Sequence, residues 1–137
     1  MKFYETSDVD DSLLRYAVIV SKYMDKWVLC KNKARKTWEI PGGRREAGEA
    51  ISDTAKRELF EETGAVQFDI MPICVYSVKE KDEGFGMLFF AEIAELGCLP
   101  ESEIEEIDFF RNIPNDMSFP LVQPKLMERV KSALCSE

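Results

Sequence analysis

The 137-residue sequence contains no histidine. Without histidine there is no Ser-His-Asp or Cys-His catalytic group, no HExxH zinc site and no imidazole general base. If the protein is an enzyme, its carboxylates must therefore supply both the general base and any metal ligands.

Paired cysteines and long apolar runs are also missing. The four cysteines are scattered without a CxxC pair, which is typical of reduced, partly buried thiols in a cytoplasmic protein. No stretch approaches the ~18–20 apolar residues of a membrane helix, and the first residues do not form a signal-peptide pattern. The sequence therefore predicts a cytoplasmic protein with no membrane partner.

Basic residues are outnumbered by acidic ones, and the net charge is −8. A broad basic surface for nucleic acid is therefore not expected. An acidic protein can still bind polyanionic small molecules when metal ions reverse the local field.

The composition that is present, 45% hydrophobic and 11% aromatic, indicates a folded protein, and the length suits one domain, residues 1–137. Strand patterns cover residues 13–22, 26–31, 37–41, 85–93 and the end of 101–110, with one or two strands in 66–80 interrupted at Pro72. Turns are expected at residues 24–25 and 80–84. Helices are expected over residues 49–63, closed by Gly64, and near the C-terminus, where Leu126, Val130 and Leu134 share one face. This pattern predicts an α+β or mixed α/β layered domain.

The helix over residues 49–63 carries two different faces. An apolar stripe recurs every four residues, at Ile51, Ala55 and Leu59. Three glutamates at i, i+3 and i+4 crowd another face, where like charges repel: Glu58, Glu61 and Glu62. A cation would relieve that repulsion, and an oxygen-only ligand set suits Mg²⁺ or Mn²⁺. The alternative is a solvated helix face with exposed salt bridges.

The spacing of these residues resembles the Nudix box, G-x5-E-x7-R-E-U-x-E-E-x-G-U, at every defined position from residue 43 to residue 65. The matching residues are Gly43, Glu49, Arg57, Glu58, Leu59, Glu61, Glu62, Gly64 and Ala65. The resemblance to Nudix hydrolases implies an α/β/α sandwich with a mixed sheet, the box helix on one face and the C-terminal helix on the other. It also implies Mg²⁺ or Mn²⁺ as the cofactor.

The same resemblance implies a role for each box residue. Glu58, Glu61 and Arg57 are expected to be catalytic, with Glu58 a candidate general base and Arg57 orienting it. The expected metal ligands are the Gly42 carbonyl, Glu58, Glu61, Glu62 and a downstream glutamate, for which Glu103 is favoured over Glu101, Glu105 and Glu106. Glu49 is expected to be structural, bonding to loop amides.

Candidate substrate-binding residues lie outside the helix, and each has a plainer alternative. Arg44 follows the glycine pair, where many family members carry a lysine or arginine that contacts phosphate. The alternative is that Arg44 lies in a solvated loop. Trp38 could stack on a nucleobase, as could Phe85, Phe89 and Phe90, or these aromatics could fill the core. Gln123 could read a purine edge or be an ordinary surface glutamine. Lys31, Lys33, Arg35 and Lys36 could attract phosphates or be solvated.

Small size and the "WEIPGG" and "FPLVQPKL" segments look most like MutT-type enzymes of the 8-oxo-dGTP diphosphatase kind. The resemblance implies a pyrophosphohydrolase acting on an (oxidised) purine nucleoside triphosphate to give monophosphate and pyrophosphate. Removal of pyrophosphate from RNA 5′ ends, another nucleotide derivative, or a non-catalytic binding module are the alternatives. Many family members are dimers, so a homodimer is compatible with the sequence.

Overall fold

The computed structural model describes residues 1–78 and 84–135. Within this part of the chain, one mixed sheet has the strand order β1-β6-β7-β2-β3-β4, with β5 paired to β2 and β8 paired to β3. Only β2 and β7 pair in parallel among these strands. The elements are β1 (Lys2–Tyr4), η1 (Thr6–Asp8), η2 (Asp11–Leu13), β2 (Leu14–Tyr23), β3 (Lys26–Asn32), β4 (Trp38–Glu39), β5 (Gly42–Arg44), α1 (Ile51–Thr63), β6 (Ala65–Ser77), β7 (Phe85–Leu96), β8 (Ile104–Phe110) and α2 (Gln123–Cys135).

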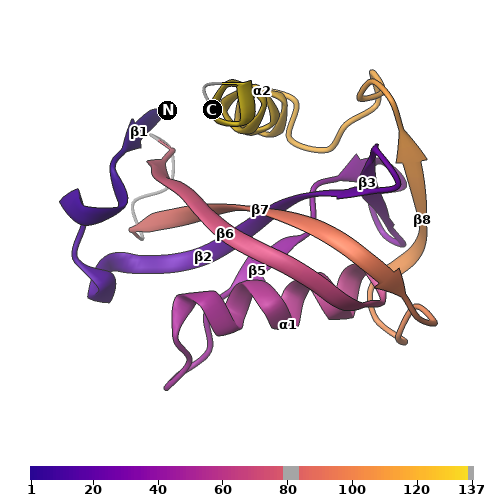
Figure 1. The fold of residues 1–137 in the computed structure, drawn as a ribbon, viewed down its shortest axis with the longest axis horizontal. Coiled ribbons are helices and arrows are strands. Elements are labelled where there is room, and N and C mark those ends of the chain that lie inside the picture. The colour runs from indigo at the N-terminus through magenta and orange to yellow at the C-terminus, as the bar shows by residue number, and fades with distance from the viewer. Residues whose placement is uncertain (79–83, 136–137) are drawn as a thin grey trace.

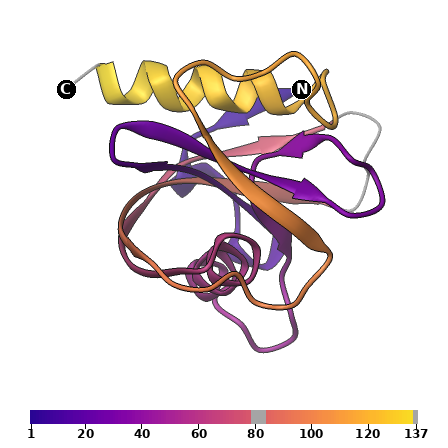
Figure 2. The same ribbon diagram turned by 90° about the vertical axis from the view of Figure 1, so that its right-hand side faces the viewer.

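The two α-helices cover opposite faces of the sheet (Figure 1). Figure 2 shows α1 nearly end-on below the strands, while α2 lies across the view above them. The expected α/β/α sandwich with a mixed sheet, the box helix on one face and the C-terminal helix on the other, is confirmed. No described helix is both long and apolar enough to cross a membrane.

Each helix closes its own hydrophobic core. On the α1 side the predicted stripe packs against side chains from one face of the central strands, such as Ile19 and Phe89. On the α2 side, Leu126 and Val130 pack with the opposite face, such as Val20 and Leu88. Neighbouring strand residues enter different cores because successive side chains point to opposite faces of a sheet.

Most expected elements are present at nearly the expected positions. Met24 and Asp25 make the β2–β3 turn, and both have positive φ (49° and 71°), as a tight two-residue hairpin requires. Gly64 ends α1 in the left-handed conformation, with φ of 81°. The turn expected at residues 80–84 lies, apart from its last residue, outside the described residues.

Some details differ from the sequence-based expectation. One strand forms in the segment 66–80, as expected, but the interruption at Pro72 is wrong: β6 runs unbroken through Pro72, with a pairing irregularity beside it. Pro72 is tolerated because β1 covers only Val75 to Ser77, so the strand is an edge at the proline. Helix α1 begins at Ile51 instead of Glu49, and β5 is an additional short strand made largely of glycine.

Candidate active site

Strand β5 brings the glycine pair against the backbone of β2 on one side and α1 on the other. Gly42 and Gly43 pair with Val18 and Ala17. A Cβ on Gly42 would lie 2.6 Å from the Ala17 carbonyl oxygen, and a Cβ on Gly43 would lie 2.2 Å from Oε2 of Glu58. Position 42 therefore requires glycine, and glycine at position 43 lets the carboxylate of Glu58 lie directly against the chain, where a Cβ would displace it.

Glu58, Glu61 and Glu62, which we call the glutamate cluster, extend from α1 toward this strand. Glu58 and Glu62 are buried, with relative exposures of 9% and 7%. The side chain of Glu61 has a relative exposure of 45%. The N–H of Gly42 donates to Oε1 of Glu62 over 2.9 Å. The structure thus brings together the box glutamates and the glycine pair.

Arg57 links this cluster to the loop that precedes α1. Its Nη1 donates to Oε2 of Glu58 (3.0 Å) and to Oε1 of Glu61 (3.4 Å). Its Nε and Nη2 donate to the two carboxylate oxygens of Glu49 (2.6 and 3.1 Å), and Nη2 also donates to the Arg44 carbonyl (3.0 Å). These bonds raise the pKa of Arg57 above its ordinary value, the bond to Glu49 most of all. One guanidinium thus holds Glu49, Glu58 and Glu61 together, and the role of Arg57 in orienting Glu58 for catalysis stays a prediction.

Glu49 has a structural environment, as expected. Besides Arg57, it accepts from the N–H of Glu46 (3.0 Å) and from the hydroxyl of Thr54 (2.8 Å). These hydrogen bonds, the one from Arg57 first, lower the pKa of Glu49 to about 2. The loop amide at Glu46 confirms the predicted bonding of Glu49 to the loop.

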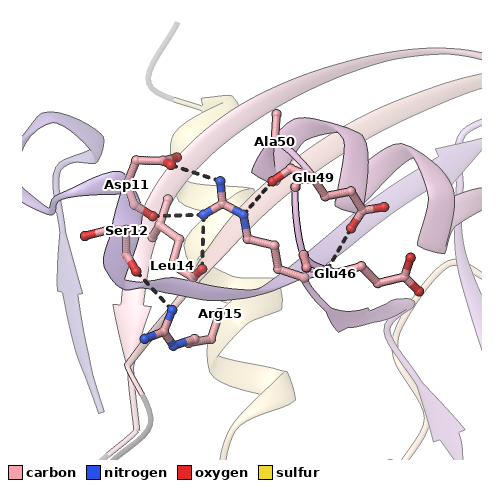
Figure 3. Close-up of a pocket in the computed structure, with 10 residues that line it drawn as sticks. Asp11, Ser12, Leu14, Arg15, Glu46, Glu49 and Ala50 are labelled. Atoms are coloured by element: carbon pink, nitrogen blue, oxygen red, sulfur yellow. Dashed lines mark hydrogen bonds and ion pairs between the residues drawn. The ribbon is translucent and has the colours of Figure 1, made fainter.

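Arg45 ties the same loop to the N-terminal segment, beside a polar hollow of about 600 Å³. Its guanidinium donates to the carbonyl of Glu49 (2.7 Å), to the carbonyls of Asp11 (2.9 Å) and Leu14 (3.2 Å), and to Oδ2 of Asp11 (2.9 Å). Asp11, Leu14 and Glu49 converge on this group (Figure 3). Arg45 therefore acts as a cross-link in the fold instead of lying in a solvated loop.

Burial dominates the electrostatics of the glutamate cluster. It raises the pKa of Glu58 to about 7, although Arg57 opposes the rise, and Glu61 adds repulsion. It raises the pKa of Glu62 to about 8 against the hydrogen bond from Gly42. The charge of Glu103, on the exposed loop before β8, raises both values further. Glu103 therefore lies close enough to act on both buried carboxylates.

The chemistry of these groups fits a hard divalent cation. The donors are carboxylate oxygens, which Mg²⁺ and Mn²⁺ prefer. Of the two buried carboxylates, Glu58 is paired with the guanidinium of Arg57, and Glu62 accepts from the Gly42 N–H. Among the described residues, no three acidic or thiol side chains already form a ready-made metal site. Glu58 and Glu61 accept from Arg57, and Glu62 accepts from the Gly42 N–H. Metal ligation by these glutamates, by Glu103 and by the Gly42 carbonyl stays a prediction.

A cavity of about 320 Å³, which we call the α2 cavity, adjoins the glutamate cluster at Gly43. Arg44 and Gln123 both line it, and the guanidinium of Arg44 lies 5.6 Å from the ring centroid of Tyr16. Gln123 is buried, and its Oε1 accepts from the N–H of Ile40 over 2.8 Å. It is therefore not an ordinary surface glutamine. The remaining lining residues are Tyr16, Val18, Tyr76, Val78, Phe119, Val122 and Leu126.

Trp38, the third substrate-binding candidate, is not among the described residues that line this cavity. It is buried in the α2-side core, and its ring packs edge-on against Phe110 with centroids 5.1 Å apart. Phe89 and Phe90 are likewise core residues, and Phe85 packs edge-on against Tyr4. This placement favours the core interpretation for all four aromatics.

The cavity is instead lined by aromatics that sequence reasoning missed: Tyr16, Tyr76 and Phe119. The available signal was alternation, because Tyr16 precedes buried Ala17 in β2 and so points away from α1. No pattern in the sequence indicates that residues 16, 76 and 119 meet.

The basic cluster near β3 is partly neutralised by acidic partners. Lys36 pairs with Glu105 (2.5 Å) and Lys31 with Glu106 (3.6 Å), both on β8. Arg35 pairs with Glu39 (2.5 Å). These contacts favour a structural role for this cluster over the attraction of phosphates.

Comparison with known proteins identifies the family. The NUDIX domain family matches residues 13–117. "Nucleoside diphosphate-linked moiety X motif 6" of Mus musculus is 59% identical over 34 residues, which are 25% of this chain and 11% of that protein. A Bacillus subtilis (strain 168) protein named "Putative 8-oxo-dGTP diphosphatase" is 37% identical over 76 residues, 56% of this chain and 50% of that protein. The matches thus span half or less of the length of these curated relatives.

Solved structures share the fold over more of the chain. The Bacillus subtilis pyrophosphohydrolase BsRppH superposes with a TM-score of 0.78 at 21% identity, covering 97% of this chain and 98% of that one. A NUDIX hydrolase from Nitrosomonas europaea superposes with a TM-score of 0.74 at 28% identity, covering 87% and 70%. With the family match extending over most of its sequence, the chain belongs to the NUDIX domain family, as the spacing of the box predicts.

Proposed function

We propose that the protein is a divalent-metal-dependent pyrophosphohydrolase that cleaves a phosphoanhydride bond of a purine nucleoside triphosphate, such as 8-oxo-dGTP, to monophosphate and pyrophosphate. One observation carries the proposal: Gly43 lies against the buried carboxylate of Glu58 and also lines a largely apolar cavity. A hydrolytic centre and a nucleoside-sized cavity are therefore next to each other.

The glutamate cluster supplies the chemistry in this proposal. The pKa of Glu58, about 7, suits a group that takes a proton from water and releases it near neutral pH. Arg57, bonded to its Oε2, holds that carboxylate in place. The residues that would hold the metal are Glu58, Glu61, Glu62, Glu103 and the Gly42 carbonyl. A bound Mg²⁺ or Mn²⁺ supplies charge neutralisation at the phosphate oxygens and a lowered pKa for bound water.

The α2 cavity supplies the substrate contacts. Its volume of about 320 Å³ lies at the lower end of small-ligand sites, which run from roughly 300 to 1,000 Å³. In this proposal Arg44, which is exposed and lines the cavity, contacts a phosphate. Gln123 presents an amide from inside the cavity for the edge of a base. The name of the Bacillus subtilis relative supports an oxidised purine nucleotide as the substrate.

A second candidate is removal of pyrophosphate from the 5′ end of RNA. The fold is like that of BsRppH, a pyrophosphohydrolase, over nearly the whole chain, which supports pyrophosphate removal for both candidates. The net charge of −8 opposes extended RNA contact but leaves binding of a terminal nucleotide open.

The test is a pyrophosphate-release screen with Mg²⁺ over 8-oxo-dGTP, the normal dNTPs, ADP-ribose, Ap4A and 5′-triphosphorylated RNA. We expect the highest kcat/KM on 8-oxo-dGTP and loss of activity in Glu61→Gln and Glu62→Gln. Glu128→Gln, an exposed change on α2, is the matched control. Activity that survives both box variants would overturn the mechanism, and a kcat/KM for 8-oxo-dGTP no better than for dGTP would remove the preference for oxidised purines.

A further inference from the structure

Phe119 has an unusual backbone for a bulky residue. Its φ is +52°, in the left-handed region that residues other than glycine and asparagine seldom adopt. Its side chain lines the α2 cavity and keeps 50% of its exposure. Such strain persists only where the surroundings enforce it, and it gathers at sites that bind ligands.

A buried carboxylate enforces the position of this ring. Arg35 lies over the ring, 5.0 Å from its centroid, and donates to Glu39 through Nε (2.5 Å) and Nη2 (3.1 Å). Glu39 is buried and also accepts from the hydroxyl of Ser118 over 2.9 Å. One carboxylate therefore fixes both the cation above the ring and the residue before it. Phe119 lines the cavity, whereas Arg35 is not among the described residues that do. The guanidinium therefore leaves the cavity side of the Phe119 ring open to a ligand.

The backbone around Phe119 is also hydrogen-bonded to β4, the strand that carries Glu39. The N–H of Ser118 donates to the carbonyl of Trp38 over 2.7 Å. The carbonyl of Phe119 accepts from the N–H groups of Val122 and Gln123, both at 3.0 Å, and so begins α2. Phe119 and the backbone of Gln123 are thus held together on the cavity wall.

We propose that Phe119 is a specificity-determining residue: it stacks on the planar base of the nucleotide, and Arg35 and Glu39 are positioning residues that hold it there. This inference rests on the proposed function and deepens it. Aromatic rings stack on nucleobases irrespective of hydrogen-bond pattern, and a purine offers a larger face than a pyrimidine. A guanidinium beyond the ring adds a cation–π attraction that fixes its orientation.

The test compares kcat and KM for dGTP, dATP, dCTP and dTTP. We expect Phe119→Leu to raise KM for the purines about 10-fold with kcat within about 2-fold, and to reduce the purine-to-pyrimidine ratio of kcat/KM. Phe119→Trp should keep the ratio. Arg35→Met should raise purine KM about 3-fold and Arg35→Lys should restore part of the loss. Leu121→Ala, 80% exposed and not lining the cavity, is the control.

A second measurement separates this inference from the proposed function. Binding of dGMP in metal-free buffer, followed by calorimetry, should be about 10-fold weaker in Phe119→Leu than in wild type. That result would uphold the stacking role even if no triphosphate were hydrolysed. The stacking role is overturned if wild type does not bind dGMP. It is equally overturned if Phe119→Leu, folded by circular dichroism, keeps both the dGMP affinity and the purine preference.

Discussion

The glutamate cluster and the α2 cavity both border Gly43, yet different forces hold them together. The cluster is an arrangement of charges, in which burial raises the pKa of Glu58 and Glu62, and Arg57 partly compensates Glu58. The cavity is formed mainly by apolar packing between the sheet and α2, with an ion pair between half-exposed Arg35 and buried Glu39 behind its aromatic wall. Changes in the cluster should therefore affect the chemical step, and changes in the cavity should affect the choice of substrate.

The largest effect is expected from Glu58→Gln. Removing the proton acceptor should lower kcat by about 10³-fold while KM stays within a few-fold. The measurement is steady-state kinetics of pyrophosphate release. A purine-to-pyrimidine ratio that changes together with kcat would show that the two regions are not separable.

Gly43→Ala should damage the cluster by sterics alone, because the new Cβ would lie 2.2 Å from Oε2 of Glu58. We expect kcat to fall about 100-fold and the free energy of unfolding to fall by about 1–3 kcal/mol. A double-mutant cycle gives the control: in a Glu58→Ala background the same glycine change should cost little stability. Equal costs in both backgrounds would mean that the clash lies elsewhere.

The stability of the metal-free protein should decrease with rising pH. Both buried glutamates have a folded-state pKa, about 7 and about 8, above the ordinary value of 4.5. The unfolded chain therefore releases these protons first, so the stability that they contribute is lost as pH rises from about 5 to about 8. Urea unfolding with a chelator present should show this loss, and Glu62→Gln should show a smaller one. The same pH dependence in both proteins would contradict the assignment of the buried charge.

The smallest loss of kcat among these variants is expected at Arg45, which contacts neither the glutamate cluster nor the α2 cavity directly. Arg45→Met removes the bonds to Asp11, Leu14 and Glu49 and should cost about 1–3 kcal/mol of unfolding free energy, with kcat lowered only a few-fold. Arg15→Met, whose exposed guanidinium donates to the Ser12 carbonyl, should stay within about 0.5 kcal/mol. Urea unfolding of both variants makes the comparison.

The sequence predicts the cluster far better than the cavity for a physical reason. The residues from Glu49 to Glu62 lie on one helix and its entry loop, so local periodicity determines which side chains share a face. The cavity wall comes from β2, β5, β6 and the residues around Phe119, which only the tertiary fold brings together. Trp38 was therefore a reasonable candidate for stacking, yet it packs in the core while Phe119 lines the cavity. Strand β5 escaped prediction because glycine has little intrinsic preference for strands.

A metal site at the buried glutamates is tested most directly by a titration with Mn²⁺ followed by electron paramagnetic resonance. We expect wild type to bind Mn²⁺ and Glu62→Gln to bind it at least about 10-fold more weakly, with Glu128→Gln unchanged. Equal Mn²⁺ affinity in wild type and Glu62→Gln would contradict the account.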